Sequence, residues 1–154
     1  MTDTAWAMLG AALAVAGGGM GSAIGITFAS NMATGVLSED PDKFAKMMAI
    51  CVLPGTQGIY GFVAGFLTFL LFDLGGNGPV AGTGVLIFAA NLPVALVALV
   101  SAIYQGLTGV GSVGLAAKQE EAFGKSMIFP ALVETYAVIA LVFTLLVLFG
   151  LPTS

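Results

Sequence analysis

The chain of 154 residues contains no histidine, and all four of its basic residues are lysines. Without histidine, no imidazole can serve as a general base or as a metal ligand. The single cysteine, Cys51, lies in an apolar run, which excludes a disulfide within the chain and a cysteine-based metal cluster. Four lysines among eight acidic residues form no basic patch, so nucleic acid is not an expected partner.

Charged residues are also scarce, at 8% of the chain, whereas a soluble domain usually contains about a quarter. Hydrophobic residues make up 58% of the chain, and the mean hydropathy is +1.06. So few charges cannot cover the surface of a water-soluble globule of this size. The composition therefore predicts an integral membrane protein and argues against a soluble enzyme of any kind.

Long apolar stretches alternate with three short connections along the chain. Each stretch is long enough to cross a bilayer as a helix, which takes about 20 residues. A barrel strand would instead alternate polar and apolar residues. The sequence predicts an all-α membrane protein whose four transmembrane helices lie within residues 5–37, 44–74, 80–115 and 122–151.

The lysines indicate how the helices are oriented in the membrane. All four lie in or beside the first and third connections, which an even number of spans places on the same side. Lysine-bearing loops are usually cytoplasmic. We therefore expect these two connections to face the cytoplasm and both termini to lie on the opposite side of the membrane.

The sequence contains an internal repeat with an offset of about 79 residues. Ser22–Ile24 recurs as Ser101–Ile103, and the Phe-x-Lys-x-Met pattern of residues 44–48 recurs at residues 123–127. The alternative is that helices rich in Ala, Leu, Val and Gly simply look alike. Because both patterns recur at one offset, we favour two tandem-duplicated helical hairpins.

The two predicted hairpins, residues 1–76 and 77–154, differ in one chemical respect. Glu134 is the only acidic residue inside a span, and in the register of the repeat it corresponds to Gly55. A charge at the bilayer centre costs about 2.5 to 3.5 kcal/mol on insertion scales, so Glu134 is a candidate functional residue. The alternative is a protonated glutamate that only makes an interhelical hydrogen bond.

Two intramembrane glutamines lie at a depth similar to that of Glu134. Counted from the nearest lysine, Gln57, Gln105 and Glu134 lie about nine to thirteen residues from the lysine-bearing surface. At 1.5 Å per residue this distance is roughly 13 to 20 Å for all three. An amide side chain needs hydrogen-bond partners that lipid cannot supply, so convergence on one site is expected.

The segment Leu53–Tyr60 supplies further oxygen atoms at this depth. Pro54 lacks a backbone donor and is expected to kink its helix and free a main-chain carbonyl. Thr56 can flank the same site as Gln57. An oxygen-rich site with one formal negative charge suits a monovalent cation better than Ca²⁺. We favour Na⁺, whereas a site for H⁺ alone would need only a carboxyl group and one acceptor.

The 22 glycines indicate close helix packing rather than phosphate binding. The run Gly17–Gly21 is embedded in an apolar helix and lacks the Lys-Ser/Thr of a phosphate loop. Small residues let helices approach closely in lipid. Hairpins with a glycine-lined first helix and a bulkier second helix are wedge-shaped, and wedges placed side by side form a closed ring.

These motifs resemble the proteolipid subunit (the K, or c, subunit) of V-type and A/V-type rotary ATPases in its duplicated four-helix form. The resemblance covers essentially the whole chain. It is carried by the glycine-rich first helix and by Leu53–Tyr60, Ala102–Gly106 and Phe129–Tyr136. The first of these three segments is similar to that of sodium-transporting members. The resemblance assigns Na⁺ binding to the carbonyl of Leu53, the hydroxyl of Thr56, Gln57, Gln105 and Glu134, with Tyr60 bonded to the carboxylate.

The resemblance also implies partners. It predicts a homo-oligomeric rotor ring in which each copy carries one ion, while other subunits hydrolyse ATP; the chain itself would be no enzyme and need no organic cofactor. Central-stalk subunits would meet the loops at residues 39–42 and 118–121, and a stator subunit would contribute an arginine. The alternatives are a proton-translocating ring and a small four-helix transporter that forms no ring.

Overall fold

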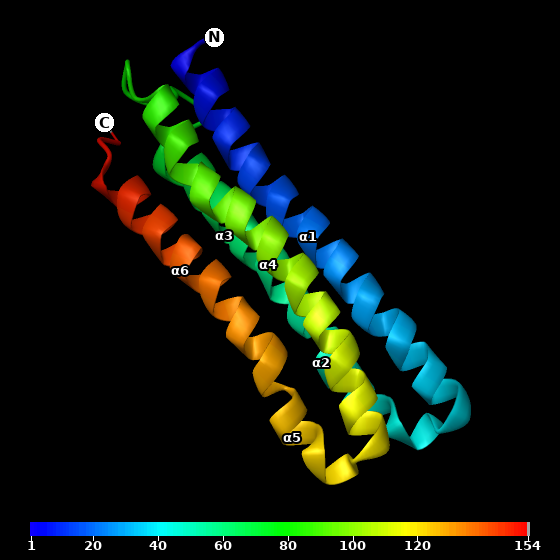
Figure 1. The fold of residues 1–154 in the computed structure, drawn as a ribbon. Helices are drawn as coiled ribbons and strands as arrows, with labels where there is room; N and C mark the ends of the chain where they lie inside the picture. Colours follow the sequence, from blue (N-terminus) through cyan, green and yellow to red (C-terminus); the bar gives the residue numbers. More distant parts are fainter. Residues whose placement is uncertain (154) are drawn as a thin grey trace.

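The computed structural model describes residues 1–153, and every regular element in that range is helical. Four rods lie side by side, with both termini at one end and the two short connections at the other (Figure 1). The first and third rods are single helices; the second and fourth are each interrupted. The rods are α1 (Asp3–Glu39), α2 with α3 (Phe44–Cys51 and Thr56–Leu71), α4 (Gly84–Lys118) and α5 with α6 (Phe123–Ser126 and Ile128–Gly150).

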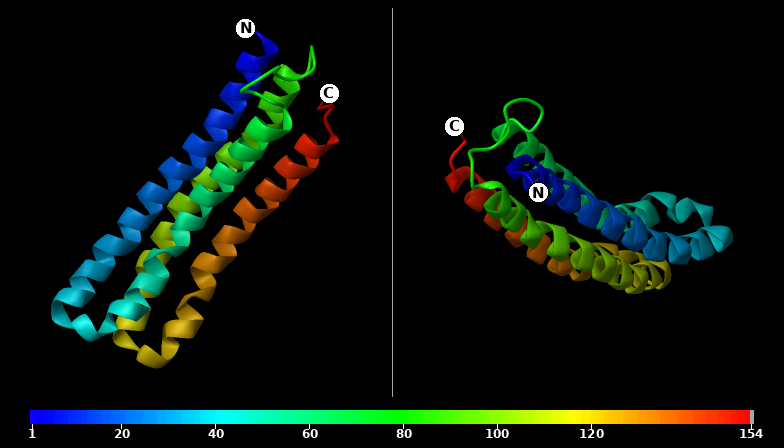
Figure 2. Two further views of the ribbon diagram at one scale, coloured as in Figure 1. Left: turned by 180° about the vertical axis from the view of Figure 1, so that it is seen from behind. Right: turned by 90° about the horizontal axis from the view of Figure 1, so that it is seen from above.

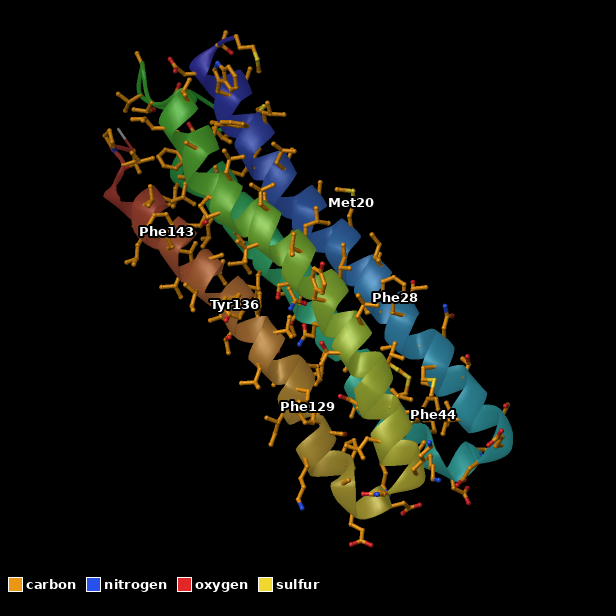
Figure 3. All side chains as sticks on the ribbon, in the orientation of Figure 1. Met20, Phe28, Phe44, Phe129, Tyr136 and Phe143 are labelled. Atoms are coloured by element: carbon orange, nitrogen blue, oxygen red, sulfur yellow. The ribbon has the colours of Figure 1, made fainter. Side chains whose placement is uncertain are left out.

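All four rods are long and apolar enough to cross a membrane. Large apolar side chains cover the outer surface of the bundle, as Phe129 and Phe143 show in Figure 3. The fully buried side chains, in contrast, include many alanines. This arrangement, with small residues inside and large apolar residues outside, is the one expected for helices packed in lipid. The predicted all-α membrane architecture is confirmed.

The element bounds repeat with the offset found in the sequence. In both halves a long helix is followed by a short 3₁₀ turn, a short helix and a second long helix. Corresponding bounds lie 79 residues apart at the ends of α1 and α4 (Glu39, Lys118), at the 3₁₀ turns (Pro41–Lys43, Glu120–Ala122) and at the ends of α3 and α6 (Leu71, Gly150). The chain is thus folded as two hairpins of the same design.

Helix α4 occupies the centre of the bundle, between α1 and α6 (Figures 1 and 2). Its contact with α1 is made through glycine. A Cβ atom added at Gly21 would lie 2.7 Å from the carbonyl oxygen of Leu99, and added carbons at Gly17 and Gly25 would meet the carbonyls of Ala95 and Ala102. The backbones of α1 and α4 therefore touch, which is what the glycine-rich first span predicts.

The predicted kink at Pro54 is present as a break between α2 and α3. Residues Leu53–Gly55 form a single 3₁₀ turn, in which the N–H of Gly55 donates to the carbonyl of Val52 at 2.9 Å. The fourth rod has a comparable break after Ser126.

Helix α4 begins at Gly84, four residues after the start of the apolar stretch at residue 80. The middle connection is correspondingly longer and contains two glycines with positive φ, Gly78 and Gly82. The carboxylate of Asp3 accepts hydrogen bonds from the N–H groups of Gly82 and Gly84, both at 3.0 Å. These bonds hold the apolar residues before Gly84 outside the helix, which hydropathy alone cannot indicate.

Candidate ion-binding site

Glu134 lies on α6, and its carboxylate faces α3 and α4 from a partly buried position. Oε1 accepts a hydrogen bond from the hydroxyl of Tyr60 on α3 at 2.6 Å. Oε2 accepts a longer one from Nε2 of Gln105 on α4, at 3.3 Å. Three helices thus meet at this carboxylate, and the two donors come from residues that the sequence placed at the same site.

The two glutamines are fully buried and are bonded to each other. Nε2 of Gln57 donates to Oε1 of Gln105 at 2.5 Å. A buried amide without a partner would be unfavourable in lipid. The pair also bridges the hairpins, since Gln57 belongs to the first and Gln105 to the second. The two amides lie beside Glu134, as the sequence predicts.

Thr56, the first residue of α3, and Leu53 in the preceding 3₁₀ turn continue the network. The hydroxyl of Thr56 lies 3.0 Å from the carbonyl oxygen of Leu53 and 3.3 Å from Oε1 of Gln57. Leu53 lies in the 3₁₀ turn Leu53–Gly55, which directly precedes α3. All six residues singled out from the sequence are therefore brought together in one hydrogen-bonded chain from Leu53 to Glu134.

Two serines take part in this region and were not predicted to do so. The hydroxyl of Ser101 donates to the carbonyl of Val133 at 2.9 Å and lies 3.4 Å from Nε2 of Gln57. The hydroxyl of Ser22 accepts from the N–H of Gly58 at 2.8 Å. Ser101 precedes Gln105 by one helix turn, a spacing that places both on one face of α4 and could have revealed it.

The chemistry of this site follows from its oxygen atoms and its single acid. A carboxylate, two amide oxygens, a hydroxyl and a main-chain carbonyl lie within one hydrogen-bonded group. Hard oxygen ligands suit hard cations, and one carboxylate balances one positive charge. The arrangement can hold a small monovalent cation or a proton and so render the carboxylate electrically neutral inside the membrane.

Comparison with known proteins agrees with this description. The family model for the C subunit of ATP synthase matches the chain twice, over residues 9–68 and 88–147. The chain belongs to this family of ATP synthase C subunits. The two matched segments coincide with the two hairpins of the fold, so the duplication predicted from the sequence is also a duplication of the family's basic unit.

Two relatives within the family match most of this chain. It is 38% identical over 141 residues to the V-type sodium ATPase subunit K of Enterococcus hirae, an alignment covering 92% of this chain and 88% of the relative. It is 39% identical over 142 residues to the A-type ATP synthase subunit K of Methanocaldococcus jannaschii, covering 92% of this chain and 61% of that longer relative.

Family membership confirms three predictions. The chain is an integral membrane protein, it is a non-catalytic proteolipid subunit, and it is a rotor-ring component of a V- or A-type ATPase complex. The small four-helix transporter that works outside a ring is thereby disfavoured.

Proposed function

We propose that this rotor-ring subunit binds and carries Na⁺, one ion per copy, coupled to ATP hydrolysis by other subunits. The observation that carries the proposal is the hydrogen-bonded chain that joins Glu134 on α6 to Gln105 on α4 and to Thr56 on α3. A site for H⁺ alone has no need of so many oxygens. The name of the bacterial relative, a V-type sodium ATPase subunit, supports the same ion.

The proposed ligands are oxygen atoms from both hairpins. They are the carbonyl of Leu53, the hydroxyl of Thr56, the amide oxygens of Gln57 and Gln105, and the carboxylate of Glu134. Tyr60 is a positioning residue in this proposal, since its hydroxyl donates to the carboxylate and holds it toward the other ligands. The carboxylate supplies the one charge that the ion requires.

Binding and release follow from the cost of charge in lipid. With Na⁺ bound, Glu134 is neutralised and the ring can turn through the bilayer without exposing a charge, which would cost about 2.5 to 3.5 kcal/mol on insertion scales. Release requires another positive charge near the carboxylate. We assign that role to an arginine of the stator membrane subunit, which would replace the ion as the counter-charge.

The orientation and the partners at the membrane surface are part of the same proposal. The end of the bundle that carries the lysines would face the cytoplasm, and both termini would lie on the other side of the membrane. Central-stalk subunits would then contact the polar connections at residues 39–42 and 118–121. The chain would divide functionally into residues 1–76, without an acid in the membrane, and residues 77–154, which carry Glu134.

Labelling by dicyclohexylcarbodiimide tests whether the bound ion is Na⁺ or H⁺. In the purified ring we expect Glu134 to be modified, and millimolar Na⁺ at fixed pH to protect it, because an ion held by the carboxylate blocks the reaction. Glu134→Gln should abolish both the labelling in the membrane and Na⁺ transport by the assembled complex. Glu120→Gln is the matched control, since this carboxylate is exposed in a connection, and it should leave protection unchanged.

The alternatives give different results in the same experiment. A proton-translocating ring would be labelled to an extent that depends on pH and is insensitive to Na⁺. A small transporter outside a ring would have a solubilised mass near 15.5 kDa, whereas a ring has a large multiple of that value. Unimpaired transport by the Glu134→Gln complex would refute the assignment of this residue.

A further inference from the structure

One side of the isolated chain has an open apolar groove between α4 and α6. Its volume is about 500 Å³, and it is lined by Leu96, Val97, Val100 and Tyr104 of α4 and by Val133 and Tyr136 of α6. Tyr136 is 66% exposed and Leu96 60%. Figure 3 shows Tyr136 on the outer side of α6. A groove of this kind in a membrane protein is filled either by lipid or by another helix.

The internal repeat indicates which of the two fills it. The groove residues on α4 correspond, at the offset of 79, to the glycines through which α1 contacts α4: Leu96 to Gly17, Val100 to Gly21, and Tyr104 to Gly25. In the first hairpin, the surface equivalent to this groove is the one that packs against α4 within the chain. A first helix of another hairpin is its natural occupant.

The matching ridge is present on the opposite side of the molecule. The α4 residues that lie against Gly17, Gly21 and Gly25 of α1 include Ala95, Leu99 and Ala102. At the repeat offset these correspond to Ala16, Met20 and Ala23 of α1. All three are exposed, and Met20 lies on the outer side of α1, away from α4 (Figure 3). We call these three residues the α1 ridge.

The charged ends of the bundle show the same complementarity. Within the chain, Lys46 on α2 pairs with Glu120 of the 3₁₀ turn Glu120–Ala122 at 2.9 Å. The repeat equivalent of Lys46 is Lys125, and Glu120 corresponds to Pro41, which is followed by Asp42. Lys125 and Asp42 are exposed, and neither makes an ion pair within residues 1–153.

We propose that the α1 ridge of one copy occupies the α4–α6 groove of the next copy, with Lys125 paired to Asp42 across the seam. The proposal rests on the ring assembly stated above and specifies which faces meet. Each copy offers a groove on one side and a ridge on the other, so the contact is head-to-tail and closes into a ring.

The two kinds of seam in such a ring differ in width. Inside a chain, glycines on α1 let the α4 backbone come into direct contact. Between copies, Leu96, Val100 and Tyr104 stand at the corresponding positions and hold the neighbouring α1 farther away. The ring therefore alternates a tight seam, which contains the candidate ion site, with a wider seam. At the wider seam Gly55 takes the place of Glu134, so it carries no acid at that depth.

Zero-length cross-linking of the detergent-purified ring tests the seam. A water-soluble carbodiimide joins a lysine amine to a carboxylate in contact with it. We expect a Lys46–Glu120 link within single chains and a Lys125–Asp42 link between copies, identified by mass spectrometry. On a denaturing gel the second link produces a ladder of multiples of 15.5 kDa. Lys125→Gln should remove the ladder and retain the link within the chain, which serves as the internal control.

A second variant tests the groove itself. Ala23→Trp places a large side chain on the α1 ridge and should prevent ring assembly, while the Lys46–Glu120 link shows that the chain still folds. Leu70→Trp is the matched control, since Leu70 and its repeat equivalent Phe149 are 57% and 61% exposed and neither belongs to the ridge or the groove. It should assemble normally.

Three results would overturn the inference. These are an intact ring that forms the Lys46–Glu120 link but no Lys125–Asp42 link, a ladder that survives Lys125→Gln, or normal assembly of Ala23→Trp. A solubilised mass of a single chain would overturn the ring itself, and with it the proposed function. Failure of the proposed seam leaves a ring in the preparation, whereas failure of the proposed function does not, so the two outcomes are distinguishable.

Discussion

Replacing Tyr60 by phenylalanine isolates the contribution of one hydrogen bond to ion binding. The ring of Tyr60 packs against a buried apolar cluster that includes Ala64 and Val94, and Phe preserves that packing. What is lost is the hydroxyl that donates to Glu134 at 2.6 Å. The remaining donor, Gln105, lies at 3.3 Å, beyond the usual range for such bonds, so it compensates little.

The size of the effect follows from the charge of the acceptor. A hydrogen bond to a charged group contributes about 1.5 to 3 kcal/mol, and about 1.4 kcal/mol changes an affinity tenfold. Because bound Na⁺ shares the charge of the carboxylate, we expect the lower end of this range. The Tyr60→Phe ring should therefore bind Na⁺ roughly tenfold more weakly than the natural ring.

The assay is the Na⁺ concentration that gives half-protection of Glu134 against dicyclohexylcarbodiimide, measured on purified rings at one pH. Tyr136→Phe is the control, because Tyr136 lies on the same helix two residues beyond Glu134 and is 66% exposed. Its half-protection concentration should equal that of the natural ring. If Tyr60→Phe and Tyr136→Phe behave alike, the hydroxyl of Tyr60 does not hold the carboxylate for the ion, and the argument from geometry is refuted.

Two further predictions use the repeat and the helix packing. Thr56→Ala should weaken Na⁺ protection about fivefold, the effect of losing about 1 kcal/mol. Thr135→Ala, its repeat equivalent, should leave protection unchanged. Equal effects of the two substitutions would contradict the assignment of the site to one seam. Gly21→Ala adds a carbon 2.7 Å from the Leu99 carbonyl and should lower the unfolding free energy in denaturing detergent by about 1 to 3 kcal/mol, whereas Gly35→Ala meets nothing within 4 Å and should not.

Much of the site was predictable because the depth of a residue in a membrane helix follows from its distance along the sequence and the helical rise per residue. The rise per residue places Gln57, Gln105 and Glu134 at one level without any knowledge of how the helices pack. Lipid supplies no hydrogen-bond partners, so three polar side chains at one level must turn toward each other. The carbonyl of Leu53 and the role of Tyr60 came from family resemblance, and the structure places both residues in the same network.

Other features depended on contacts between residues far apart in the chain. Ser101 bonds to Gln57 and to the main chain of α6, and its one-turn spacing from Gln105 indicates a shared helix face but not these partners. The start of α4 depends on Asp3, a residue at the other end of the first hairpin. A hydropathy profile cannot indicate a helix cap that is supplied by a residue distant in the sequence.

The sequence by itself determined that the chain is a membrane protein and that it is a duplicated helical hairpin. It also determined that one carboxylate and its amide neighbours lie near the middle of the bilayer. These properties depend on composition, on period and on distance along a helix axis. Only the tertiary structure decided which helix faces which, because that depends on the shapes of packed surfaces. The glycines of α1 admit α4, whereas the bulkier residues of α4 leave a groove open for another helix.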